Sequence, residues 1–176
     1  MEALEKISKI REYLDYLEKH IKNVEKAWEE VKVKLKEFPQ IWDDYQYFSL
    51  DEAIKRHDIS KVSKEEFIQY ADFFYPCDST LEDAKERIAT EFNTAWQNHI
   101  KMNEHHWENW TTSKYRDNPY FDGVSMVHMV VDWLAMSYEF GDTPRQYYEA
   151  NKEKIKIPET CEDLLERIFI ALEVVK

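Results

Sequence analysis

The sequence predicts an all-α fold, a compact multi-helical bundle formed by a single domain over residues 1–176. Apolar residues recur every three or four positions in several segments, as they do on one face of a helix. Ser or Thr followed three residues later by an acidic residue or Gln recurs as a signal of helix starts. No segment shows the alternation of apolar and polar residues that is typical of a half-buried strand.

The first helix is predicted to end at Pro39, which cannot continue a helix. Its apolar stripe consists of Ile7, Ile10, Leu14, Leu17, Ile21, Val24, Trp28, Val31 and Leu35. Such a stripe also fits a coiled-coil seam. Because only this segment carries a sustained heptad, a long helix packed along a bundle is the favoured interpretation.

Capping boxes predict the starts of five later helices. They are Ser49 with Glu52, Ser63 with Glu66, Ser79 with Glu82, Thr143 with Gln146, and Thr160 with Asp163. The first of these helices would contain His57, and the second would stop before Pro76. A further helix is predicted over residues 122–139 with Gly141 as its stop, and residues 110–120 are predicted to form the one substantial loop.

Composition excludes several classes of function. A net charge of -12 argues against binding to duplex nucleic acid, which needs a basic face. The two glycines, Gly123 and Gly141, cannot build a glycine-rich phosphate loop. The cysteines Cys77 and Cys161 form no disulfide framework, and no signal peptide or membrane span is recognisable. We therefore expect a cytoplasmic protein that does not bind membranes.

Histidines and aspartates in three segments are candidate metal ligands. The adjacent residues His57 and Asp58, if helical, would point roughly 100° apart and could both reach one ion. Asp132 lies between apolar residues, where a carboxylate needs either a cation or a buried ion pair. His20 borders the apolar stripe, so a satisfied histidine at the core edge is its alternative. For His128, one turn before Asp132, an ordinary helix residue is favoured over a partner of a ligand.

A fourth segment, HIKMNEHHWENW, is the richest in histidine. If it is helical, His99, Asn103 and His106 share one face, and His105 points elsewhere unless the helix ends there. The alternative is a polar, solvated helix face.

The order of His20, then His57 and Asp58, then Asp132 resembles the H…HD…D signature of the HD-domain phosphohydrolase superfamily. Lys61 stands where that family often has a lysine shortly after the HD pair. The whole chain is most similar to small, often phage-encoded HD-like proteins of unassigned function.

The motifs that carry this second resemblance are HD-x-SK at 57–61, H-x3-N-x-HH at 99–106 and DW-x-AMS at 132–137. The GYP element of the cyclic-dinucleotide branch is absent, so that substrate class is not implied. His99 also lies closer to the histidine pair than in many binuclear members.

The resemblance implies a metal-dependent phosphohydrolase with one or two divalent transition-metal ions, drawn from Mn, Fe, Co, Ni and Zn. The implied ligands are His20, His57, Asp58 and Asp132 for the first ion, and His99, His105 and His106 for a second. Asp58 and Lys61 would be catalytic, and Lys61 and Asn103 would bind substrate. The ion would lower the pKa of a bound water and polarise a phosphoryl oxygen.

The expected partner is a small phosphorylated substrate, a nucleotide in particular, with a homodimer as the expected assembly. Three aromatic side chains, Trp107, Trp110 and Tyr115, could stack on a base or serve as packing. The alternative function is a protein that sequesters a nucleotide in an HD pocket without turnover. A third hypothesis is a helical interaction protein in which a metal only stabilises the fold.

Overall fold

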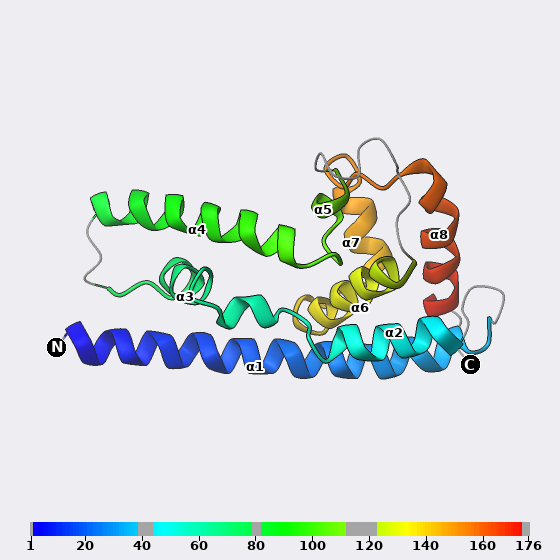
Figure 1. Ribbon diagram of the computed structural model, residues 1–176, viewed down its shortest axis with the longest axis horizontal. Helices are drawn as coiled ribbons and strands as arrows, with labels where there is room; N and C mark the ends of the chain where they lie inside the picture. The colour runs from blue at the N-terminus through cyan, green and yellow to red at the C-terminus, as the bar shows by residue number, and fades with distance from the viewer. Residues whose placement is uncertain (1, 39–43, 79–81, 112–122, 174–176) are drawn as a thin grey trace. The chain divides into compact units, whose positions relative to one another are not determined.

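The computed structural model describes residues 2–38, 44–78, 82–111 and 123–173 (Figure 1). These residues form eight α-helices and one 3-10 helix, with no strand in the described ranges, which confirms the all-α prediction. The helices are α1 (Glu2–Leu35), α2 (Asp44–Ile54), η1 (Ile59–Val62), α3 (Phe67–Phe74), α4 (Glu82–Met102), α5 (Trp107–Thr111), α6 (Gly123–Phe140), α7 (Pro144–Asn151) and α8 (Glu159–Glu173). Within the described part of the chain, no helix combines the length and apolarity needed to span a membrane.

The chain divides into two compact units. Unit 1 consists of Met1–Ile21 and Asp58–Asn103, and unit 2 consists of Lys22–His57 and Glu104–Lys176. Helix α1 therefore contributes its first part to unit 1 and its remainder to unit 2. Each unit has its own hydrophobic core.

The core of unit 1 is formed by the first part of α1 together with α3 and α4. Its buried members are Tyr13, Leu17, Tyr70, Ala71 and Ala95. Tyr13 is 1% exposed, whereas Ile7 and Leu14 of the predicted stripe are 45% and 41% exposed. The stripe prediction was wrong for those two residues because the Tyr13 ring occupies the core beside Phe67, with ring centroids 5.5 Å apart.

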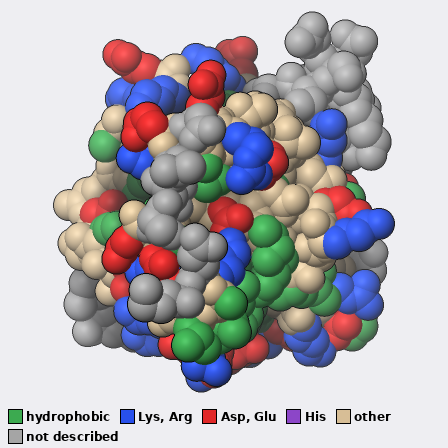
Figure 2. Space-filling view, turned by 90° about the vertical axis from the view of Figure 1, so that its left-hand side faces the viewer, with side chains coloured by type: hydrophobic (Ala, Val, Ile, Leu, Met, Phe, Trp, Pro, Cys, Tyr) green, Lys and Arg blue, Asp and Glu red, His purple; other side chains and the backbone are tan. Residues whose placement is uncertain are grey.

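Helix α3 also leaves apolar side chains on the surface of unit 1. Ile68, Phe73 and Phe74 are all exposed. In the view of Figure 2, hydrophobic side chains gather in one region of the surface, among acidic and basic side chains.

The core of unit 2 is built around α6, which packs against α2, α7 and α8. Ten residues of α6 are buried: Ser125, Met126, Val127, His128, Met129, Val130, Val131, Trp133, Ala135 and Ser137. A helix that is apolar around most of its circumference belongs in an interior. The polar residues His128 and Asp132 therefore lie on the most buried helix of this unit.

Two of the predicted helix signals are confirmed in atomic detail. Thr143 caps α7 through a reciprocal capping box: its side chain accepts from the Gln146 backbone N–H, and the Gln146 side chain accepts from the Thr143 backbone N–H. Gly141 follows α6 with a positive φ of 77°, and its N–H donates to the Ser137 carbonyl. That backbone conformation is readily accessible to glycine.

Two predicted helix starts were wrong. Ser49 lies inside α2, which begins at Asp44 and ends at Ile54, so His57 is not on that helix. Ser63 does not cap α3; it follows η1, and its backbone N–H donates to Ser60. Both motifs match a capping box, but tertiary contacts place the helix boundaries elsewhere.

Several predictions concern residues outside the described ranges or at their edges. Pro39, Ser79, Asp122 and residues 112–120 of the predicted loop, including Tyr115, lie outside the described residues. Residues 110 and 111 belong to α5, so the loop prediction began too early. Helix α8 begins one residue before Thr160, whose side chain is also outside the described set. Cys77 and Cys161 are both free thiols, as expected.

Candidate functional site

Asp58 stands at the junction between two helical segments and has an unusual backbone. It precedes η1 with φ 55° and ψ 20°, in the left-handed region. It is the one non-glycine residue with positive φ among the described residues. Aspartate tolerates this region better than most residues, yet the conformation costs on the order of 1 kcal/mol and persists where surrounding contacts fix it. The predicted helical arrangement of the HD pair was therefore wrong: Asp58 sits in a turn.

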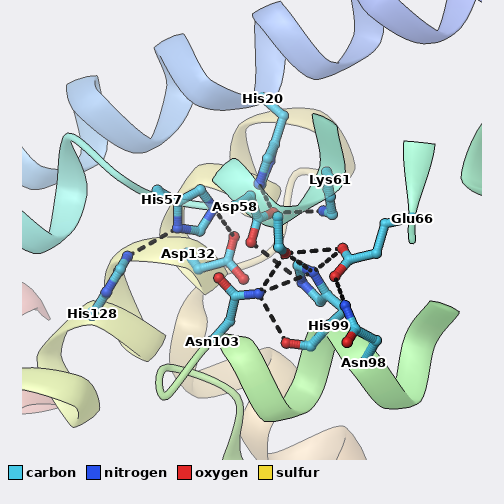
Figure 3. A network of polar contacts seen from close by, with 11 residues as sticks. His20, His57, Asp58, Lys61, Glu66, Asn98, His99, Asn103, His128 and Asp132 are labelled. Atoms are coloured by element: carbon cyan, nitrogen blue, oxygen red, sulfur yellow. Dashed lines mark hydrogen bonds and ion pairs between the residues drawn. The ribbon is translucent and has the colours of Figure 1, made fainter. Parts of the chain in front are cut away.

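Within unit 1, the Asp58 carboxylate lies between two imidazoles (Figure 3). His20 Nε2 lies 3.5 Å from Asp58 Oδ2, and His99 Nε2 lies 3.3 Å from Asp58 Oδ1. Lys61 Nζ contacts Oδ2 of the same carboxylate at 2.5 Å. The three side chains of Asp58, His20 and His99 are all buried. One carboxylate thus offers each of its oxygens to a different imidazole nitrogen.

The other ring nitrogen of His99 faces a second carboxylate. His99 Nδ1 lies 2.9 Å from Glu66 Oε2, and Glu66 has no exposed surface. Burial lowers the pKa of His99, but hydrogen bonds with Asp58 and Glu66 outweigh burial, and the net pKa is raised. The His99 ring is therefore held between two carboxylates.

Two buried tyrosines line the same region of unit 1. Burial raises the pKa of both Tyr13 and Tyr70, so both are neutral phenols at pH 7. Lys61 Nζ lies 5.6 Å from the centre of the Tyr70 ring, and the His99 ring meets Tyr70 edge-on at 5.8 Å. Tyr70 thereby restricts both of these polar side chains from one side.

Within unit 2, three histidines and an aspartate form a second cluster. His57 Nε2 lies 3.7 Å from Asp132 Oδ1, and His57 Nδ1 lies 2.9 Å from His128 Nε2. The His105 ring centroid lies 4.7 Å from that of His57 and 4.4 Å from that of His128. His106 lies beside His105, with ring centroids 4.5 Å apart.

Both clusters have donor atoms that fit a metal ion. Two ligand atoms about 2.1 Å from the same ion lie roughly 3–3.5 Å apart at ordinary coordination angles. The contacts of Asp58 with His20 and His99 have that spacing. In unit 2, ligand atoms of His57, His105 and His128 all lie within 4.8 Å of one another. Imidazole and carboxylate donors together suit transition metals.

Charge balance in unit 1 is compatible with either a bound cation or a protonated His99. Asp58 and Glu66 are buried carboxylates, and Lys61 supplies one positive charge beside them. One buried negative charge remains and requires either a protonated imidazole or a bound cation. In unit 2, Asp132 lies beside the buried His57 and is itself partly exposed.

The structure distributes the predicted site residues between the two units. Unit 1 holds His20, Asp58, Lys61, His99 and Asn103, and unit 2 holds His57, His105, His106 and Asp132. The contacts described above join His20, Asp58, Lys61 and His99 in unit 1. In unit 2 they join His57, Asp132, His105 and His106.

The helical face predicted for His99, Asn103 and His106 does not exist. Helix α4 ends at Met102, where the Asn103 side chain donates to the His99 carbonyl oxygen at 2.8 Å. His106 comes after that end and directly before α5. The prediction was wrong because Asn103 binds a carbonyl of the last turn and so favours termination of the helix.

Four residues with a place in these clusters were not predicted to belong to the site: Ser60, Glu66, Asn98 and His128. The interpretation of Ser63 and Glu66 as a capping box concealed the buried role of Glu66.

Of the aromatic candidates, Trp110 is buried in the core of unit 2 and donates to the Glu104 carbonyl at 2.8 Å, so it serves packing. Trp107 packs partly buried against the same core. No histidine is visible on the face in Figure 2, and five of the six histidines are buried.

No curated protein and no solved structure matches this chain. One family model matches residues 9–171, which includes every predicted site residue and both clusters. The chain therefore belongs to DUF5662, a family of unknown function.

Proposed function

We propose that this chain is a metal-dependent phosphohydrolase that cleaves a phosphoester in a nucleotide or a related small phosphate. The observation that carries the proposal is the buried Asp58 carboxylate with an imidazole Nε2 at ligand spacing from each oxygen. A carboxylate in that position would hold a divalent ion together with an imidazole. His20, Asp58 and His99 would be the ligands in unit 1.

His57 and Asp132 would be the ligands in unit 2. His57 and Asp58 are consecutive residues, and both belong to the ligand set that the resemblance to the HD superfamily implies. A bound divalent ion supplies a nucleophilic water at neutral pH and polarises a phosphoryl oxygen. His105 and His106 remain candidates for a second ion.

The chain's own residues would contribute binding and proton transfer. Asp58 would accept a proton from the attacking water, because its carboxylate is ionised and held beside Lys61. Lys61 would contact a phosphate oxygen as a point charge and would orient the phosphoryl group. Asn103 is also proposed to bind substrate. Its amide already donates to the Ser60 hydroxyl and to the His99 carbonyl oxygen.

The test is a phosphate-release screen across nucleotides and cyclic nucleotides, supplemented in turn with Mn, Fe, Co, Ni and Zn. We expect release with at least one metal and loss of release in His57→Ala. Stoichiometric nucleotide binding without release would instead select the sequestering function. Metal-dependent folding with neither binding nor release would select the structural role.

A further inference from the structure

Glu66 is the most deeply buried carboxylate among the described residues of unit 1. It has 0% exposure and lies at the turn before α3, where a solvated side chain would be the ordinary arrangement. An ionised carboxylate without exposure costs several kcal/mol unless donors surround it. The burial of this carboxylate therefore requires hydrogen-bond donors close to it.

Three donors meet the Glu66 carboxylate (Figure 3). The Asn98 amide donates to Oε1 at 2.7 Å, and the Ser60 hydroxyl donates to Oε2 at 2.9 Å. His99 Nδ1 lies 2.9 Å from Oε2. The Ser60 hydroxyl in turn accepts from the Asn103 amide at 2.9 Å. All of these contacts join η1, the turn before α3, and the end of α4 within unit 1.

The contact with Glu66, the shortest at His99 Nδ1, indicates which nitrogen of His99 carries a hydrogen; Ser60 Oγ and Asn103 Nδ2 each lie 3.1 Å from the same Nδ1. An ionised carboxylate only accepts, so the contact with Glu66 requires a hydrogen on His99 Nδ1. In the neutral ring, Nε2 then keeps its lone pair, and Nε2 is the atom that faces Asp58 at 3.3 Å. A histidine that binds a metal through one nitrogen commonly donates from the other to a carboxylate.

We propose that Glu66 is a positioning residue that holds His99 in its Nδ1–H tautomer and presents Nε2 to the ion bound at Asp58. This inference rests on the proposed function, because it requires a metal at Asp58. The competing role for Glu66 is purely structural, as a satisfied buried carboxylate that ties η1 to α4.

The experiment compares Mn²⁺ affinity by calorimetry in wild type, Glu66→Gln and Asn98→Ala. Glutamine lacks the charge and cannot accept from both Asn98 and His99, because one end of its amide is a donor. We expect Glu66→Gln to weaken Mn²⁺ binding about 10- to 100-fold. Asn98→Ala removes a Glu66 partner but leaves the contact with His99, so it should lower the melting temperature and change Mn²⁺ affinity much less.

Equal loss of melting temperature in the two variants, with Mn²⁺ affinity unchanged in both, would overturn the positioning role and leave the proposed function intact. A wild-type protein that binds no ion would overturn both. A measurement on the wild type needs no variant to fold: ¹⁵N spectra of the Zn²⁺-loaded protein should show His99 with hydrogen on Nδ1. Hydrogen on Nε2 would contradict the proposal.

Discussion

His20 Nε2 lies 3.5 Å from Oδ2 of Asp58, and both side chains are buried. Without a cation, His20 Nε2 can donate a hydrogen to this carboxylate, which Lys61 also contacts. With a cation, the two atoms are ready-made neighbouring ligands. This contact therefore supports the proposed metal binding.

The first prediction concerns metal content. Asp58→Asn keeps the shape of the side chain and the tolerance of asparagine for positive φ, but removes the charge. We expect elemental analysis to find metal in the wild type and little in Asp58→Asn. Asp51→Asn, which changes a carboxylate paired with Lys32 outside the clusters, is the matched control and should keep its metal. Equal metal in Asp58→Asn and wild type would remove Asp58 from the ligand set.

The second prediction separates a metal ligand from an ion-pair partner at Asp132. If Asp132 balances a metal, Asp132→Asn should lose most phosphate release. If Asp132 only pairs with His57, the loss should be in stability, about 3–5 kcal/mol for a stranded buried partner. Kinetics and thermal unfolding on the same preparation distinguish the two. Full activity with a lowered melting temperature would argue for the ion pair.

The third prediction concerns His128, whose Nε2 lies 2.9 Å from His57 Nδ1. If His57 donates this hydrogen bond, the carbonyl oxygen of a glutamine can replace the acceptor and a leucine cannot. We expect His128→Leu to weaken metal binding about tenfold or more, and His128→Gln to lie closer to wild type. Loss of the metal in both variants would show instead that His128 is itself a ligand, with His57 and His105.

The fourth prediction tests the packing of α1 against α2 in unit 2. Asp51 accepts from Trp28 Nε1 at 2.6 Å and from Lys32 Nζ at 2.7 Å. Burial raises the pKa of Asp51, but these two donors outweigh burial, and the net pKa is lowered. A lowered pKa means that the stabilisation exists above the ordinary pKa of about 3.9 and is lost as pH falls through the folded value.

Asp51→Asn should therefore reduce the free energy of unfolding by about 1–2 kcal/mol at pH 7, a value discounted for partial exposure. The difference from wild type should shrink below about pH 4. Denaturant unfolding at both pH values measures it. A difference that stays constant with pH would mean that the carboxylate charge is not what stabilises this contact.

Much of the fold was predictable because it depends on local chemistry. The periodicity of α1 and the apolar sequence of α6 report burial directly, and Thr143 and Gly141 fix helix ends through their own side chain or backbone. The capping-box motif failed at Ser49 and Ser63 because the same residue types also serve turns and tertiary contacts.

The candidate site was predictable in its first members and not in their partners. Asp132 was predicted from its apolar neighbours in sequence, and His57 from its place beside Asp58. Glu66 was not predicted, and an ordinary helix residue was favoured for His128, because their polar contacts are with residues 33 and 71 positions away. A glutamate three residues after a serine also fits a capping box at the start of a solvent-exposed helix. The left-handed backbone of Asp58 carried no sequence signal beyond the tolerance of aspartate for that conformation.

We propose that this protein hydrolyses a phosphoester with a metal held by its clustered histidines and aspartates. The most direct measurement is phosphate release from a nucleotide panel by one preparation, as purified, after chelation, and after return of the divalent ion. We expect phosphate release that disappears when the metal is removed and returns when the metal is restored. Release that continues in protein shown by elemental analysis to be metal-free would contradict it, as would metal-loaded protein that releases phosphate from no member of the panel.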